Sequence, residues 1–265
     1  MDVRHYNREA WDRQVAARSP WTLPVSAAVV AAARAGDWSV ILTPTLPVPR
    51  TWFPADPSCD VLCLASGGGQ QAPVLAAAGM RVTVFDNSPA QLAMDSLVAE
   101  REGLDLTIVE GDMADLGRFP DDAFDVIVHP VANCFVPDVH PVWREAFRVL
   151  RPGGSLLAGM MNPAYYIFDY EKLVLGELEV RFDLPYSDVE NLDAAALAQY
   201  QEEGTPLEFS HTLDDLVGGQ MTAGFLLAGY YEDRFAPADD CALSRRMPTM
   251  FATRALKPPV GWPLA

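Results

Sequence analysis

Short apolar runs alternate with amphipathic stretches along the middle of the chain. Apolar runs of about five residues, bounded by turn residues, are typical of strands that are buried on both faces of a sheet. Such runs lie at residues 61–65, 81–85, 106–110, 124–128 and 155–159. Because stretches with helical spacing follow three of these runs, the pattern predicts a parallel sheet with helices on both faces.

Residues with strong positional preferences mark the ends of the intervening helices. Ser88 and Pro89 are suited to cap and begin one helix, whose inner face we expect to carry Ala90, Ala93 and Leu97. Further helices are expected at residues 6–16, 26–35 and 70–78, and after Asp138.

The alternation stops at residue 161 and resumes near residue 212. Residues 161–211 are aromatic and acidic, with no clear period. Thr212 with Asp215 then matches a capping box, and apolar runs at 225–231 and 249–255 are expected to pair antiparallel at the sheet edge. We therefore expect one domain with four segments: a helical N-terminal cap (1–58), a core (59–160), an insertion or lid (161–211), and a helix with a β-hairpin (212–257) that completes the sheet.

The charge balance narrows the classes of partner. The 265 residues carry 19 basic and 36 acidic side chains, a net charge of −17. Nucleic acids and anionic membranes need a basic surface, so neither is expected as a partner. Residues 161–211 hold eleven acidic residues against two basic ones. This excess indicates either a solvated acidic face or a lid that favours neutral or cationic substrates.

The cysteines and the first residues bear on the cellular location. Cys59, Cys63, Cys134 and Cys241 form no CxxC pair, and no histidine has zinc-site spacing, so no metal is expected. Residues 1–14 lack the apolar core of a secretory signal, and no apolar run is long enough for a membrane span. We expect reduced thiols, a cytoplasmic location and no association with membranes.

A glycine turn directly after the first strand carries the strongest chemical signal. Gly67-Gly-Gly69 lets a ligand approach the backbone, and the following helix presents free N–H groups. Asp86 ends the second strand, 17 residues after Gly69, where a carboxylate can accept both hydroxyls of an adenosine ribose. The spacing of Gly67, Gly69 and Ala72 also fits a dinucleotide fingerprint, so NAD remains an alternative at this point.

Several motifs in order resemble the class I S-adenosylmethionine-dependent methyltransferases, which have a Rossmann-like, doubly wound α/β sheet with an antiparallel seventh strand. The resemblance covers about residues 58–160 and, more weakly, 211–257. The matching segments are Leu64–Gly69, Asp86, Glu110-Gly-Asp-Met-Ala114, Phe124-Asp-Val-Ile-Val-His-Pro130, Val149-Leu-Arg-Pro-Gly-Gly154 and His211-Thr-Leu-Asp with Ala-Gly-Phe225.

The resemblance implies S-adenosylmethionine as the cofactor and assigns roles to individual residues. The glycine turn approaches the methionine part, Asp86 holds the ribose, Asp112 accepts from the adenine amino group, and Met113 packs on the ring. A loop acid and an ordinary core methionine are the alternatives for the last two. The full set of implied cofactor contacts is Ala65, Ser66, Gly67, Gly68, Gly69, Gln70, Asp86, Asn87, Asp112, Met113 and His129.

The sequence departs from the family pattern at Cys63, where the first motif usually carries an acid that helps to hold the cofactor's amino group. Backbone carbonyls, Gln70 or Gln71 are left to do so. This departure keeps open a protein that binds the nucleotide without catalysis. A nicotinamide-dependent oxidoreductase, which rests on the glycine spacing alone, also remains open.

Transfer of a methyl group from a sulfonium is a single in-line displacement, so the protein mainly aligns the reactants and excludes water. His129 ends the fourth strand near the expected methyl group. It is interpreted as a catalytic base, an orienting donor, a contact of the cofactor or the substrate pocket, or a structural residue. The small-molecule acceptor is expected to lie between the cap and the insertion. Candidates for its pocket are Trp11, Trp21, Asn133, Tyr165, Tyr166 and His211, several of which have packing or turn roles as alternatives.

Overall fold

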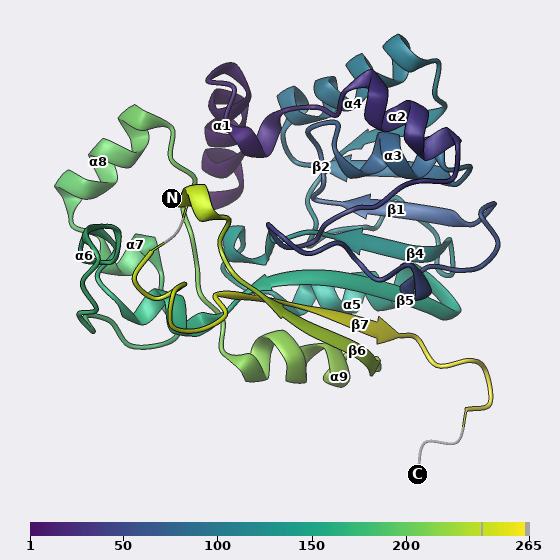
Figure 1. Ribbon diagram of the computed structural model, residues 1–265. Coiled ribbons are helices and arrows are strands. Elements are labelled where there is room, and N and C mark those ends of the chain that lie inside the picture. Colours follow the sequence, from purple (N-terminus) through teal and green to yellow (C-terminus); the bar gives the residue numbers. More distant parts are fainter. Residues whose placement is uncertain (240, 263–265) are drawn as a thin grey trace.

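The computed structural model describes residues 1–239 and 241–262 and has one seven-stranded sheet at its centre (Figure 1). The strand order is β3-β2-β1-β4-β5-β7-β6. Neighbours among the first five strands pair in parallel, and β7 runs antiparallel to both β5 and β6. The strands are β1 (Asp60–Leu64), β2 (Arg81–Asp86), β3 (Leu106–Glu110), β4 (Phe124–His129), β5 (Leu150–Met161), β6 (Leu226–Asp233) and β7 (Met250–Leu256).

This architecture confirms the predicted Rossmann-like sheet with one antiparallel strand. The two C-terminal strands pair antiparallel as expected. The chain places β7 between β5 and β6, so β6 is the edge strand.

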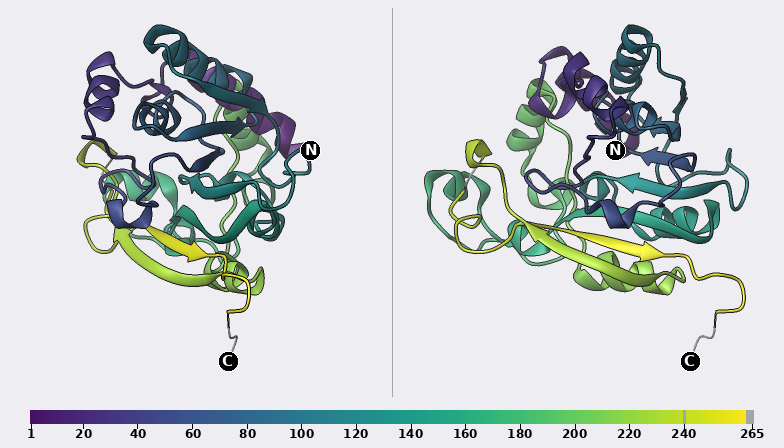
Figure 2. Two further views of the ribbon diagram at one scale, coloured as in Figure 1. Left: turned by 90° about the vertical axis from the view of Figure 1, so that its right-hand side faces the viewer. Right: turned by 45° about the vertical axis from the view of Figure 1, so that its right-hand side comes forward.

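Helices cover both faces of the sheet (Figures 1 and 2). The alternation of side chains along β1 explains this arrangement. Val61 and Cys63 pack with residues of α2 (Ala27–Arg34), α3 (Gln71–Ala77) and α4 (Pro89–Glu102). Leu62 and Leu64 pack with α5 (His140–Val149) on the opposite face. The short helix α9 (Gly219–Thr222) contacts α5 on that face. Because successive strand residues point to opposite faces, one apolar run supplies both cores.

The beginning of α4 was predicted correctly, but its buried face was not. The Ser88 hydroxyl accepts a hydrogen bond from the Gln91 amide at 3.1 Å, which confirms the cap. Leu97 is 50 % exposed, and the buried side carries Gln91, Leu92, Asp95 and Val98. The helix turns a polar side inward because Asp95 and Gln91 meet the glycine turn there.

The N-terminal helix α1 (Val3–Ala16) lies beside residues far along the chain, and Figure 1 shows it next to α8 (Ala194–Glu203). Asn7 makes three of the contacts. Its amide donates to the carbonyls of Phe135 and Leu207 at 3.1 and 3.0 Å, and its oxygen accepts from the Leu207 amide at 2.8 Å. The Tyr6 hydroxyl also donates to the Thr205 carbonyl. These bonds hold α1 and the end of the 161–211 segment together.

The 161–211 segment contains a 3-10 helix (Pro163–Ile167) and three short α-helices joined by irregular chain: α6 (Tyr170–Leu175), α7 (Asp188–Asn191) and α8. The predicted capping box follows it, with Thr212 and Asp215 bonded reciprocally at 2.9 and 3.1 Å. Among the described residues, no helix combines the length and the apolar character needed to cross a membrane.

Candidate active site

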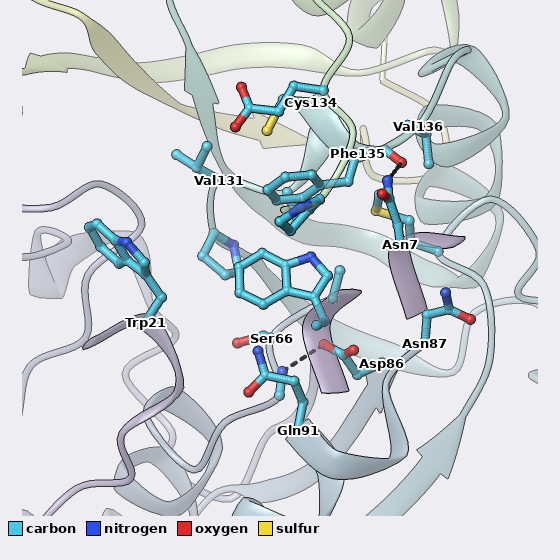
Figure 3. Close-up of a pocket in the computed structure, with 18 of the residues that line it drawn as sticks. Asn7, Trp21, Ser66, Asp86, Asn87, Gln91, Val131, Cys134, Phe135 and Val136 are labelled. Atoms are coloured by element: carbon cyan, nitrogen blue, oxygen red, sulfur yellow. Dashed lines mark hydrogen bonds between the residues drawn. The ribbon is translucent and has the colours of Figure 1, made fainter. Parts of the chain in front are cut away.

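A cavity of about 880 Å³ opens where the parallel strands end at their carboxyl termini. The loops that follow β1, β2, β3 and β4 all contribute to its wall, as expected for a ligand site in an open parallel sheet. One face of α1 also lines it, with Val3, Arg4, Asn7, Trp11 and Gln14 at helical spacing. In Figure 3, Ser66, Asp86 and Gln91 lie toward one end of the cavity, and Val131 and Cys134 lie toward the other.

Asp86 and the first glycine of the turn are fixed against each other. The Gly67 amide donates to the Asp86 carboxylate at 2.9 Å, and the Ser88 amide donates to its other oxygen at 2.9 Å. A Cβ atom at Gly67 would lie 2.7 Å from the Cβ of Gln91 and 3.1 Å from the Asp86 carboxyl group, so this position needs glycine. Burial raises the pKa of Asp86, and the amide hydrogen bonds oppose that shift. The result is a preorganised acceptor at the end of β2.

The other two glycines of the turn face a second acid. Gly68 and Gly69 do not line the cavity; the Gly68 amide donates to Asp95 of α4 at 3.0 Å. Asp95 is fully buried, and burial raises its pKa to about 8, opposed by its hydrogen bonds with the turn. The sequence interpretation missed this residue, although its position four residues after Gln91 places both on one helix face.

The remaining predicted contacts of the turn lie on the cavity wall and tie the N-terminal segment to it. Ala65, Ser66, Gln70 and Asn87 all line the cavity. The Gln70 side chain donates to the Leu23 carbonyl at 3.2 Å, and the Asn87 amide donates to the Arg4 carbonyl at 2.9 Å.

Asp112 and Met113 lie after β3 on the same wall. The Asp112 carboxylate accepts from the Ala114 amide at 2.9 Å and lies 3.6 Å from the Arg4 guanidinium. Asp112 therefore also caps its own turn. Met113 is buried in the core and also borders the cavity, a position that suits either of the two roles considered for it.

His129, Asn133 and His211 form a buried chain behind the cavity wall, and none of them lines the cavity. The His129 Nδ1 lies 2.8 Å from the Leu64 carbonyl, and its Nε2 lies 2.9 Å from the Asn133 side-chain oxygen. The His211 ring contacts the Asn133 carbonyl at 3.0 Å. Burial lowers the pKa of both histidines. The contacts of these three residues join the end of β1 to the turn after β4.

The predicted aromatic residues divide between the cavity and the core. Trp11, Trp21 and Tyr165 line the cavity, and Trp11 packs edge-on against Phe135 with ring centroids 5.2 Å apart. Tyr166 is buried outside the cavity, and its hydroxyl donates to the Glu208 carboxylate at 2.7 Å.

Glu208 itself lines the cavity and was not singled out in the sequence. Burial raises its pKa to about 7; the Tyr166 hydrogen bond opposes this shift and the nearby Asp188 adds to it. The residue lies in a segment without regular period, where no motif marks it.

The cofactor end of the cavity fits an adenosyl nucleotide. The bare backbone at Gly67 permits close approach, and Asp86 and Asp112 present acceptors at the ends of neighbouring strands. Within residues 1–239 and 241–262, no group of three or more histidine, cysteine or acidic residues could hold a metal ion.

Comparison with known proteins agrees with this geometry. Residues 62–158 match the family model described as a methyltransferase domain. The chain is 46 % identical to the uncharacterized methyltransferase YbaJ of Bacillus subtilis (strain 168) over 252 residues, which is 95 % of this chain and 97 % of that protein.

Solved structures share the fold. An S-adenosylmethionine-dependent methyltransferase from Mesorhizobium loti is 19 % identical with a TM-score of 0.57, and a putative one from Listeria monocytogenes is 18 % identical with a TM-score of 0.58. Each comparison covers 78 % of this chain and 94 % of the other. The glycine turn, the two strand-end acids and the near full-length relative together show that the chain belongs to the class I S-adenosylmethionine-dependent methyltransferases.

Proposed function

We propose that the protein transfers the methyl group of S-adenosylmethionine to a small-molecule acceptor bound in the same cavity. One observation carries this proposal: a single cavity of about 880 Å³ joins the Asp86 end to a second end walled by Tyr165, Phe235 and Met161. This volume lies in the upper range for small-molecule sites, which supports room for two ligands. The net charge of −17 supports a small acceptor over a nucleic acid.

The cofactor, when bound, supplies a methyl group on a sulfonium, which is a good leaving group. Asp86 accepts hydrogen bonds from the ribose hydroxyls, and Asp112 accepts one from the adenine amino group. Met113 gives the ring a polarisable surface. Trp11 and Trp21 cover the cavity and exclude water from the reacting atoms. The catalytic contribution of the protein is then mainly alignment.

We assign His129 a positioning role. Its ring nitrogens face Leu64 and Asn133, and the side chain does not reach the cavity. A base needs hydrogen-bond reach to the proton that it removes, which this arrangement does not give. His129 instead fixes the strand end that carries the glycine turn.

We propose that the N-terminal cap (1–58) and the insertion (161–211) select the acceptor. Hydrogen bonds from Asn7 to Phe135 and Leu207 hold α1 and the end of the insertion together over the cavity. All four cysteines are free and buried, which supports a cytoplasmic location.

Calorimetric titration with S-adenosylmethionine, S-adenosylhomocysteine and NADH tests the cofactor assignment. We expect the two sulfur nucleotides to bind and NADH not to bind. Asp86→Ala should weaken binding by about tenfold or more, because a buried acceptor for two hydroxyls is lost. Asp37→Ala, an exposed acid beyond α2, is the matched control and should bind as the parent does. Binding of NADH, or unchanged binding by Asp86→Ala, would refute the assignment.

A further inference from the structure

Glu208 presents a carboxylate to the acceptor end of the cavity; the other acids among the described lining residues are Asp86 and Asp112 at the cofactor end and the exposed Asp138. The Tyr166 hydroxyl donates to one of the Glu208 oxygens at 2.7 Å. Among the described residues, no other side chain donates a hydrogen bond to this carboxylate, and no cation pairs with it. Cys134, Tyr165 and Tyr170 line the same cavity, and burial raises the pKa of each, with a further contribution from the Glu208 charge.

The charge of the cavity wall is strongly one-sided. Arg4 is the one lysine or arginine among the described residues that line the cavity, and it lies 3.6 Å from Asp112 at the cofactor end. An acceptor with a carboxylate or phosphate group would therefore meet no cation beside Glu208, and it would be repelled by it. A cationic acceptor would relieve the cost of the partly buried carboxylate.

Aromatic rings complete this end. Tyr165 packs edge-on against Tyr170 and Phe235, with centroids 6.5 and 5.4 Å apart, and all three line the cavity. Rings around a carboxylate are suited to a nitrogen cation, because the ring faces carry partial negative charge. Tyr166 is buried and holds Glu208 in place from behind.

We propose that the methyl acceptor is an amine whose nitrogen binds Glu208 between the rings of Tyr165 and Tyr170. This inference rests on the proposed function and names the class of acceptor for that same cavity. The uncommitted oxygen of Glu208 takes a proton from the bound ammonium, which frees the nitrogen lone pair. The lone pair then forms the nitrogen–carbon bond as the carbon–sulfur bond breaks, and the electron pair of that bond stays on sulfur. The protonated Glu208 returns its proton to solvent when product leaves.

Two series of probes, each with an amine, an alcohol and a carboxylic acid on closely matched carbon chains, test the class of acceptor. Phenethylamine, 2-phenylethanol and 3-phenylpropanoate are titrated into the protein saturated with S-adenosylhomocysteine, and hexylamine, hexan-1-ol and heptanoate form a second series. Labelled S-adenosylmethionine then reports methyl transfer to each probe. We expect each amine to bind at least about tenfold more tightly than its alcohol, the acids to bind weakest, and label to appear on nitrogen.

Two variants separate Glu208 from general surface charge. Glu208→Gln keeps an oxygen for the Tyr166 hydroxyl and should abolish the preference for amines, with binding of S-adenosylhomocysteine unchanged. Glu203→Gln, an exposed residue of α8, removes the same charge from the same segment and should keep the preference.

Equal binding of amine and alcohol in both series, failure of every amine to bind, or a preference that survives Glu208→Gln would each overturn the amine assignment. These outcomes leave the proposed function standing as long as S-adenosylhomocysteine binds. Failure of the parent protein to bind S-adenosylhomocysteine would instead refute the proposed function itself.

Discussion

Replacing Asp95 with asparagine should change how stability depends on pH. The Asp95 carboxyl group is fully buried beside the glycine turn, and burial raises its pKa from 3.8 to about 8. One carboxyl oxygen accepts from the Gly68 amide, while the other is buried without a partner, as is the side-chain oxygen of Gln91. A protonated carboxyl group, or an asparagine amide, supplies a donor where two acceptors otherwise go unpaired.

The magnitude follows from proton linkage. Since the folded-state pKa lies above the unfolded value of 3.8, the folded protein keeps the Asp95 proton that the unfolded chain releases. The stability from this group is fully present below pH 3.8 and is lost as pH rises toward about 8. The loss is about 1.4 kcal/mol per pH unit, or about 3 kcal/mol between pH 5 and pH 7. Asparagine has no such proton and lacks this slope.

Urea unfolding of the parent and of Asp95→Asn at pH 5 and pH 7 measures the effect, because other titrating groups cancel in the difference. From pH 5 to pH 7, the free energy of unfolding of the variant should rise by about 3 kcal/mol relative to that of the parent. Asp95→Ala, which removes the acceptor for Gly68, should be less stable than Asp95→Asn at both. A difference between parent and Asp95→Asn that does not change with pH would show that Asp95 is ionised in the folded protein, and would refute this reasoning.

Three further substitutions test other parts of the structure by urea unfolding. Asn7→Ala leaves the buried Leu207 amide and carbonyl without their partner and should cost about 2–4 kcal/mol; a cost below about 0.5 kcal/mol would show that α1 is held by other contacts. Gly159→Ala places a Cβ atom 2.3 Å from the Leu42 carbonyl oxygen and should cost about 1–3 kcal/mol, with no loss expected if that segment moves freely. Cys63→Asp puts a second carboxyl group into the fully buried core beside Asp95 and should cost about 3 kcal/mol or more, increasingly as pH rises; a neutral result would exclude their proximity.

The features that could be predicted from the sequence are those set by short-range chemistry. Residues 106–110 were predicted as a strand and form β3 with the same bounds. The Ser88 cap and the Thr212–Asp215 box were also predicted, because a capping side chain bonds within its own turn. Asp86 could be placed at the cavity because the carboxyl ends of parallel strands meet at one sheet edge.

The features that could not be predicted depend on which distant segments meet. Tyr165 and Tyr166 are neighbours of the same chemistry, yet Tyr165 lines the cavity and Tyr166 is buried behind it. Glu208 gains its environment from Tyr166 and Asp188, which come from other parts of an aperiodic segment. Leu97 was expected on the inner face of α4 because it is apolar. It is exposed instead, because the hydrogen bond between Asp95 and the glycine turn orients the polar side of the helix inward.

That contact of Asp95 also bears on the departure at Cys63. In the methyltransferases that this sequence resembles, an acid usually stands at the position of Cys63 on the first strand. Here Cys63 is fully buried, and the nearby Asp95 of α4, after burial, raises its pKa. Two carboxyl groups in one dry core would repel each other and each would lose its hydration, so an acid at position 63 would be costly beside Asp95. Asp95 lies on α4 and accepts a hydrogen bond from the Gly68 amide on the side of the turn away from the cavity. On the cavity side, Asp86 accepts a hydrogen bond from the Gly67 amide, so two acids hold the turn although position 63 is not acidic.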